Sequence, residues 1–238
     1  MSEAVARTIS SGPHPLDDVV GNALATRHKR FAIGDERAMR YPQAVGPFGA
    51  IYGASEESLA ALRSLVDAHG PVALVTPDPL VPADGFSVIN HRELLQMVWQ
   101  DRPEQQDDLQ YERLAARDIP EMLALIDAAQ PGPFGARTIE LGSYFGVRRQ
   151  GRLIAMAGER MQVDGFTEIS AVCVDAAFRG QGLAAGLMKL LGSAIRARGE
   201  TPFLHVLTTN LNAIALYRAL GFVDRREMHI TVLGRSQS

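Results

Sequence analysis

Between residues 169 and 198 the chain carries an apolar run, a short loop with two glycines and a long amphipathic segment. The run from Ile169 to Val174 predicts a buried strand. Leucine, alanine and isoleucine then recur every three or four positions, which predicts a helix from Gly182 to Arg198 that ends at Gly199. A strand that leads directly into a helix is typical of α/β and α+β proteins, so we expect a sheet with helices packed on it.

The loop between this strand and this helix suits an anionic ligand. Gly180 and Gly182 let the backbone come close to a bound group, and the free amides at the start of a helix attract phosphate. The same letters also fit an ordinary tight turn that needs glycine only for its backbone angles. Both interpretations are open at this point.

Two familiar phosphate-binding motifs do not fit the loop. The letters Gly180-x-Gly182-x-x-Ala185 imitate a dinucleotide fingerprint, with Glu200 near the distance of the acid that holds the ribose. That acid belongs after the next strand, whereas Glu200 precedes the strand expected from Phe203. A P-loop is excluded because no Gly-Lys-Ser/Thr follows.

The composition is that of a globular protein, since 46% of the 238 residues are hydrophobic and 21% are charged. The N-terminus shows no signal-peptide pattern and no run of about 18 apolar residues occurs, so we expect a cytoplasmic protein with no membrane partner. The net charge of -3 argues against a general nucleic-acid binder. Residues 179–238 nevertheless carry eight Lys/Arg against three Asp/Glu, whereas residues 101–178 carry eight against thirteen. The last quarter therefore favours an anionic ligand.

A polar, turn-rich stretch at 101–108 separates two more apolar segments, and we place a domain boundary there. This predicts an N-terminal α/β domain over 1–108 and a second domain over 109–238. Asp118, with Glu121 three residues later, is expected to cap the first helix of the second domain. The expected helices are 58–69, 119–129 and 212–220, and the expected further strands are 71–76, 144–147, 153–161 and 203–207.

Two motifs in the second domain identify a family. The first is Arg179-x-x-Gly182-x-Ala184 at the start of a helix, and the second is Asn210-x-x-Ala213-x-x-Leu216-Tyr217-x-x-Leu220-Gly221-Phe222. This ordered pair resembles the GNAT superfamily of acyl-CoA-dependent N-acyltransferases over roughly residues 110 to 233. The resemblance implies a mixed central sheet flanked by helices, with a smaller α/β N-terminal domain. Similarity to two-part members further suggests that residues 1–108 form a degenerate GNAT-like half.

The same resemblance implies a site for acetyl-CoA as co-substrate and no metal. Backbone amides of the loop and helix start would bind the pyrophosphate, with Arg179 beside them, and the preceding strand would pair with the pantetheine amides. Asn210, Ala213 and Tyr217 belong to the same site, although Asn210 also suits a helix cap. The implied backbone contacts come from Val172, Cys173, Val174, Gly180, Gln181, Gly182, Leu183 and Ala184.

Catalysis by such a protein needs one proton donor and one proton acceptor. Tyr217 matches the position that protonates the departing thiolate in many relatives; its alternative role is packing beside Phe222. A nucleophilic amine is mostly protonated at neutral pH, so a general base is needed, and Glu168 at the start of the strand is the leading candidate. Glu140 and Glu159 are weaker candidates, each better explained as a surface or paired charge.

Three further segments admit a chemical role and a plainer one. Cys173 would give acyl transfer through a thioester, but it sits in an apolar run that favours a core residue. His205 alternates with apolar neighbours, which favours a hydrogen-bonded histidine within the sheet. The stretch Pro131 to Phe134 either borders the acceptor pocket or simply ends the preceding helix.

The sequence thus predicts an N-acetyltransferase that transfers acetyl to a primary amine by direct attack in a ternary complex. The acceptor is a small-molecule or peptide amine, and both a monomer and a homodimer are open. The main alternative is a non-catalytic acyl-CoA-binding regulatory module. A dinucleotide-dependent oxidoreductase is a distant third.

Overall fold

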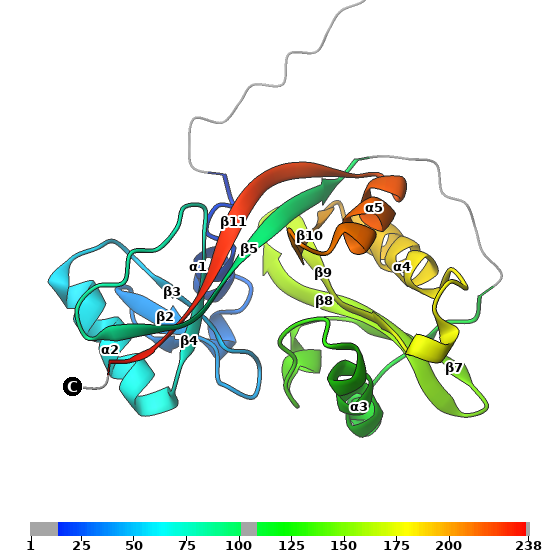
Figure 1. Ribbon diagram of the computed structural model, residues 1–238, viewed down its shortest axis with the longest axis horizontal. Coiled ribbons are helices and arrows are strands. Elements are labelled where there is room, and N and C mark those ends of the chain that lie inside the picture. Colours follow the sequence, from blue (N-terminus) through cyan, green and yellow to red (C-terminus); the bar gives the residue numbers. More distant parts are fainter. Residues whose placement is uncertain (1–13, 101–108, 237–238) are drawn as a thin grey trace, which may run out of the picture.

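The computed structural model describes residues 14–100 and 109–236, and these residues form an 11-stranded mixed sheet flanked by helices (Figure 1). The strand order is β1-β2-β3-β4-β11-β5-β10-β9-β8-β7-β6. The mixed α/β architecture expected from the sequence is confirmed. The predicted boundary stretch, 101–108, lies outside the described residues.

The described residues form five α-helices and eleven strands. The α-helices are α1 (Val19–Ala25), α2 (Glu56–His69), α3 (Ile119–Ala129), α4 (Leu183–Ala197) and α5 (Leu211–Ala219). The strands are β1 (Ile33–Gly34), β2 (Ala38–Arg40), β3 (Phe48–Ile51), β4 (Val72–Thr76), β5 (Phe86–Trp99), β6 (Glu112–Arg113), β7 (Tyr144–Arg149), β8 (Arg152–Val163), β9 (Phe166–Val174), β10 (Thr201–Leu207) and β11 (Phe222–Arg235). Single 3₁₀ turns are η1 (Lys29–Phe31), η2 (Ala116–Asp118), η3 (Thr138–Leu141) and η4 (Ala176–Phe178).

Two long strands join the N-terminal half of the chain to the C-terminal half. β5 and β11 pair antiparallel from Trp99↔Phe222 to Phe86↔Arg235. β5 also pairs with β10, and β11 also pairs with β4, so the sheet is continuous through both halves. Figure 1 shows this long ribbon bridging the two ends of the molecule. The division into domains 1–108 and 109–238 stays a prediction, and the sheet itself has no break there.

The helices cover both faces of the sheet in the C-terminal half. α4 and α5 pack on one face, over a core that includes Met97 and Trp99 of β5. α3 packs on the opposite face, over a core that includes Tyr144, Met156 and Cys173. Figure 1 shows α3 apart from α4 and α5, with the sheet between them. We call the α3 side the α3 face and the other the α4 face.

Most of the predicted elements are present with shifted ends. α3 spans 119–129 as expected, and the expected helices at 58–69, 182–198 and 212–220 differ from α2, α4 and α5 by two residues or fewer at each end. The expected cap of α3 is wrong in detail. Asp118 occupies the N-cap position, but its carboxylate accepts from the amide of Ala115 and pairs with Arg148, so it makes no side-chain cap bond to α3.

Candidate active site

The centre of the site is a gap between two parallel strands. β9 pairs with β10 only from Phe166↔Thr201 to Glu168↔Phe203, although β9 runs on to Val174 and β10 to Leu207. Beyond Phe203, β10 stays paired with β5 on its other side. The edge of β9 that faces β10 therefore lacks a ladder partner after Glu168, and its backbone groups are free to pair with an extended ligand.

A bulge reshapes β9 at the start of this gap. The register with β8 shifts between Met156↔Cys173 and Gly158↔Ser170, which places one extra residue in β9. Ala171 within it has φ +53, a left-handed conformation that is unfavourable for a residue other than glycine. Strain of this kind concentrates at functional sites. The predicted contact residues 172–174 follow directly after it.

The glycine loop leaves a row of unused amides at the start of α4. Gly180 and Gly182 both have φ +77, and nothing lies within 4 Å of where a Cβ atom would stand on either. Gly182 is the N-cap of α4 and offers no side-chain cap, and within the described residues the amides from 180 to 184 donate no hydrogen bond. Arg179 and Gln181 are exposed beside them. The loop thus has both properties considered above: it is a turn that needs glycine, and it presents donors that suit a diphosphate.

The second motif forms the start and the inner side of α5. The Asn210 side chain accepts a hydrogen bond from the Ala213 amide at 3.2 Å, which confirms the helix-cap role. Its amide NH₂ group makes no hydrogen bond in the described part of the chain and stays able to donate. Tyr217 packs beside Phe222 with ring centroids 6.1 Å apart. Burial raises the pKa of Tyr217 to about 12, and its hydroxyl has no partner among the described residues.

Glu168 stands at the apex of the gap, where β9 and β10 part. It is fully buried and accepts two hydrogen bonds from Arg160, each 2.8 Å long, and one from His205, also 2.8 Å long. Burial alone would raise the pKa of this carboxyl, but the Arg160 guanidinium and the hydrogen bonds from Arg160 and His205 bring it well below its usual range. Glu168 is therefore an ionised, firmly held carboxylate.

The same network reaches into the N-terminal half through Gln96 of β5. The Gln96 carbonyl oxygen accepts from Arg225, so its nitrogen is the donor to the Leu16 carbonyl and to Nε2 of His205, 2.9 Å away. His205 Nε2 consequently accepts, and Nδ1 carries the hydrogen that Glu168 receives. This agrees with the interpretation of His205 as a hydrogen-bonded residue of the sheet.

The other residues considered as general base or nucleophile have different contacts. Glu159 is buried and pairs with Arg198 at 3.0 Å, and Glu140 pairs with Arg137 at 2.7 Å on the surface. Cys173 is buried, and burial raises the pKa of its thiol to about 12. A thiol held neutral in this way is a poor nucleophile, which agrees with the core role.

The stretch after α3 lies across the α3 face. Phe134 meets the ring of Tyr144 edge-on, with centroids 5.6 Å apart. The following residues are fixed to the N-terminal half, because Thr138 donates to the Val45 carbonyl at 2.7 Å and the Arg137 amide donates to the Ala44 carbonyl at 2.9 Å. The N-terminal half thus fixes the residues that follow Phe134 on the α3 face.

Sequence reasoning missed Arg160, Gln96 and Tyr144. One usable signal for Tyr144 was Gly158, since a glycine inside a strand often marks the close approach of another group. A Cβ atom on Gly158 would lie 2.2 Å from the Tyr144 ring. Arg160 and Gln96 gave no such signal, because charged or polar residues are common on strands with one exposed face.

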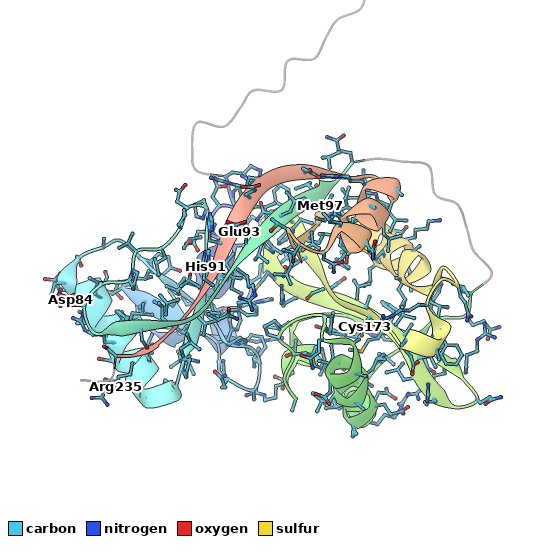
Figure 2. The ribbon with its side chains drawn as sticks, viewed as in Figure 1. Asp84, His91, Glu93, Met97, Cys173 and Arg235 are labelled. Atoms are coloured by element: carbon cyan, nitrogen blue, oxygen red, sulfur yellow. The ribbon has the colours of Figure 1, made fainter. Side chains whose placement is uncertain are left out.

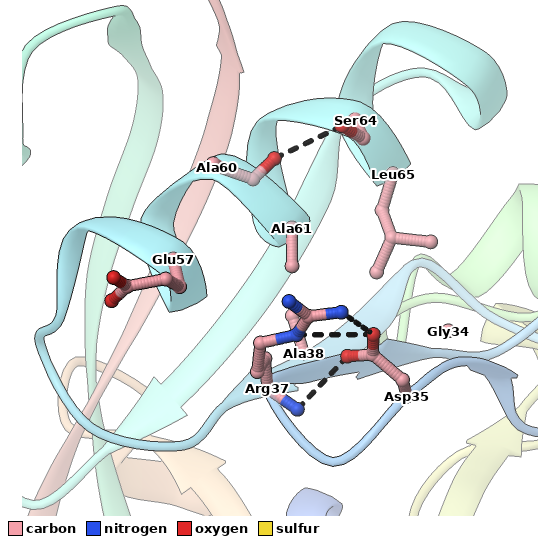
Figure 3. Close-up of a pocket in the computed structure, with 9 residues that line it drawn as sticks. All are labelled: Gly34, Asp35, Arg37, Ala38, Glu57, Ala60, Ala61, Ser64 and Leu65. Atoms are coloured by element: carbon pink, nitrogen blue, oxygen red, sulfur yellow. Dashed lines mark hydrogen bonds and ion pairs between the residues drawn. The ribbon is translucent and has the colours of Figure 1, made fainter.

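Two hollows on the surface lie away from the gap between β9 and β10. One of about 510 Å³ lies between α2 and the turn that joins β1 to β2 (Figure 3). Its charged groups are largely satisfied by an exposed Asp35–Arg37 pair. A second lies beside Phe86 and Arg235, and Figure 2 places Arg235 and Cys173 in different halves of the molecule. Neither hollow contains a residue of the two sequence motifs.

Two classes of feature are missing from the described residues. Residues 14–100 and 109–236 contain no group of three His, Cys, Asp or Glu side chains that could hold a metal ion. No helix in these ranges combines the length and the apolar character needed to cross a membrane.

Comparison with known proteins agrees with the two motifs. Residues 144–230 match the model of the FR47-like protein family. A protein of Novosphingobium aromaticivorans DSM 12444 assigned to the GNAT family is 40% identical, with 94% of this chain and 100% of that chain covered and a TM-score of 0.87. No curated protein matches the chain.

More distant structures share the fold over nearly the whole chain. A GCN5-related N-acetyltransferase from Kribbella flavida is 18% identical over 94% of this chain and 96% of that one, with a TM-score of 0.63. A conserved protein of unknown function from Staphylococcus epidermidis ATCC 12228 is 15% identical over 86% and 93%, with a TM-score of 0.56. With the extent and identity of the Novosphingobium match, these findings show that the chain belongs to the GNAT family of acetyltransferases.

Proposed function

We propose that this chain transfers an acetyl group from acetyl-CoA to a primary amine by direct attack, with both substrates bound together. The observation that carries the proposal is the alignment of two binding features around one gap. At one end, the backbone amides at 180–184 have no hydrogen-bond partner in the part of the chain that the structure describes, and the edge of β9 without a ladder partner there leads from them toward Glu168. A molecule with a diphosphate and an amide-bearing arm matches both features in order.

Within this site the side chains of the two motifs have separate tasks. Arg179 and Gln181 lie beside the amides that would hold the diphosphate, and the Asn210 NH₂ group is a spare donor toward the arm. Tyr217 contributes a neutral phenol. As the amine nitrogen bonds to the acetyl carbon, the carbon–sulfur bond breaks, the amine loses one proton and the sulfur gains one. The Tyr217 hydroxyl would donate a hydrogen bond to that sulfur.

The role of Glu168 as general base stays a prediction. Its carboxylate is ionised, as a base requires, but its three hydrogen bonds with Arg160 and His205 make it a weak proton acceptor. A Glu168→Gln variant tests the base role, because an unchanged acidic limb of the pH–rate profile would remove it.

Two glycine variants test the cofactor site. Gly182 and Gly199 lie at opposite ends of α4 and have φ +77 and +80. In each of the variants Gly182→Ala and Gly199→Ala, the new Cβ atom would stand in open space. They carry a similar backbone strain, about 1 kcal/mol or somewhat more. Only Gly182→Ala crowds the free amides, so we expect it alone to weaken acetyl-CoA binding, by about tenfold or more in calorimetry. Equal affinity in the two variants would contradict the proposed site.

Turnover is tested with acetyl-CoA and a panel of amines, read as release of free thiol. The panel holds amino acid amides, short peptides, polyamines and simple alkylamines. We expect wild type to release thiol with at least one class of amine. The Tyr217→Phe variant should have a kcat about 10²-fold lower and an unchanged affinity for acetyl-CoA. Binding of acetyl-CoA without thiol release across the panel would favour the non-catalytic module instead.

A further inference from the structure

The hydroxyl of Tyr144 on β7 is buried and has no hydrogen-bond partner among the described residues. The side chain is 1% exposed, and its oxygen is one of a few buried polar atoms without a partner. Native proteins leave few such groups, because an unsatisfied buried polar atom is costly. A position that keeps tyrosine where phenylalanine would fill the same space calls for a partner that binds from outside the chain.

The ring is directed from β7 across β8 toward the gap. Tyr144 pairs with Gly158 of β8, and Gly158 pairs with Ser170 of β9. The ring lies over Gly158, where a side chain would collide with it, and it shares a core with Cys173 and Ala171 of β9. Its hydroxyl is therefore on the α3 face, near the bulge where β9 separates from β10.

A second donor without a hydrogen-bond partner among the described residues belongs to Arg160, two residues beyond Gly158 on β8. Arg160 uses Nε and Nη2 to bind Glu168, whereas its Nη1 makes no hydrogen bond within the described residues. The charges of Arg160 and Glu168 are near enough to Tyr144 to act on the pKa of its phenol, although burial is the dominant effect and raises that pKa. The phenol thus stays protonated. An O–H group and a guanidinium N–H group together call for an oxygen atom.

Phe134 packs against the Tyr144 ring. It belongs to the stretch after α3, is half-buried, and touches the Tyr144 ring edge-on. The residues that follow it are tied to the N-terminal half, whereas Phe134 itself is held only by packing. We therefore expect rotation of the Phe134 side chain to be the movement that admits a ligand beside this ring.

We propose that the Tyr144 hydroxyl, together with Nη1 of Arg160, binds a carbonyl or carboxylate oxygen next to the amine of the acceptor. The inference rests on the proposed acetyl transfer and narrows its substrate class. Acceptors would be amino acids, their amides or peptide N-termini, in which such an oxygen lies two bonds from the carbon that bears the amine. Simple alkylamines lack it. Tyr144 would be an acceptor-binding residue on the α3 face, opposite the cofactor loop.

Matched substrates and matched variants test this inference. Phenylalaninamide and 2-phenylethylamine differ by the carboxamide, as do alaninamide and ethylamine. Wild type and Tyr144→Phe are assayed with both pairs at saturating acetyl-CoA. We expect Tyr144→Phe to lower kcat/KM for the amides by about tenfold, mainly through KM, and to change the value for the alkylamines by less than about twofold.

Stability separates this role from a structural one. Removal of an unsatisfied buried hydroxyl should leave the melting temperature unchanged or raise it. Tyr52→Phe is the control, because the Tyr52 hydroxyl donates to the Gly21 carbonyl at 2.9 Å far from the gap. It should lower the melting temperature and leave kcat/KM unchanged for every amine.

The remaining outcomes overturn the inference in distinguishable ways. An equal effect of Tyr144→Phe on amides and alkylamines, or no effect on either, removes Tyr144 as the oxygen-binding group while acetyl transfer stands. If the wild-type protein acetylates alkylamines but no amino acid amide, the proposed substrate class is wrong. Wild type that releases no thiol with any amine overturns the proposed function and this inference together.

Discussion

The two halves of the chain contribute to the site in opposite ways. The C-terminal half supplies contiguous motifs with groups that make no hydrogen bond among the described residues, such as the backbone amides at 180–184 and the side-chain NH₂ group of Asn210. The N-terminal half supplies none of these. It contributes Gln96 to the buried network and holds the stretch after α3 through the carbonyl of Val45. The groups of the proposed cofactor site thus come from one half, whereas the other half fixes residues on the α3 face.

The difference shows that a half without motifs can still be structurally indispensable. β5 lies between β10 and β11, so it joins these two strands of the C-terminal half in one sheet. Its Trp99 donates to the Leu220 carbonyl at 2.8 Å and packs in the core under α4. The acetyltransferase half is therefore completed by a strand from the other half.

The largest expected effect follows from removing that strand. A fragment of residues 109–238 would leave β10 and β11 without their common neighbour and would expose the core around Ile195 and Phe222. We expect it to aggregate or to lack a cooperative thermal transition, measured by near-UV circular dichroism and size exclusion. Mixing it with residues 1–108 should restore the transition. A fragment that melts cooperatively near the temperature of the full chain would show that the halves fold independently.

The next effect concerns the buried ion pair at the apex. Arg160→Met leaves the Glu168 carboxylate buried with His205 as its one remaining side-chain partner. We expect the free energy of unfolding to fall by about 3–5 kcal/mol, measured by urea denaturation at pH 7. The double variant Arg160→Met/Glu168→Gln should recover part of this loss, because no unpaired charge remains. A single variant as stable as wild type would show that water reaches the carboxylate.

The same pair predicts how wild type responds to acid. The pKa of Glu168 is lower in the folded protein than its ordinary value of 4.5, so the unfolded chain binds the proton first. The contribution of this group to stability is complete above pH 4.5 and is lost progressively as the pH falls below it. Urea midpoints between pH 7 and pH 3 should therefore fall less steeply for the double variant than for wild type.

The α4 face offers a smaller test of the contact between the halves. In a helix, glycine to alanine ordinarily stabilises by up to about 1 kcal/mol. Gly192 in α4 is an exception, because its Cβ atom would lie 1.9 Å from Cζ3 of Trp99, whose indole is fixed by its hydrogen bond. We expect Gly192→Ala to destabilise by about 1–3 kcal/mol in urea denaturation. Trp99→Phe in the same chain should relieve the clash, and failure to do so would indicate another cause.

These contacts mark the limit of what the sequence allows. Periodicity located α2 and α4, because each of these helices packs one face on the sheet and repeats its apolar residues accordingly, whereas α3 and α5 were predicted from residues that start or end a helix. It did not indicate the pairing of β5 with β10 and β11, since a strand's partners depend on contacts with residues far away in the chain. The outer part of β5 is exposed and polar, so it also lacks the usual signal of a strand.

The site divides in the same way. The glycine loop and the start of α5 could be predicted because local backbone geometry, at Gly182 and at the Asn210 cap, requires particular residues close together in the sequence. The surroundings of Glu168 could not. Arg160, His205 and Gln96 come from three strands, and only the register of the sheet brings their polar atoms together.

The smallest predicted effect separates the two roles of Asn210. Its Oδ1 caps α5, and its Nδ2 is free to meet the cofactor arm. Asn210→Asp keeps the cap and removes the donor, whereas Asn210→Ala removes both. We expect Asn210→Ala to lower the free energy of unfolding by about 1 kcal/mol, and Asn210→Asp to leave it nearly unchanged. Acetyl-CoA affinity, measured by calorimetry, should fall in both variants by a similar factor. If the affinity falls only in Asn210→Ala, the Asn210 side chain acts only as the cap of α5. The proposed cofactor site in the C-terminal half then includes fewer residues than its motif implies.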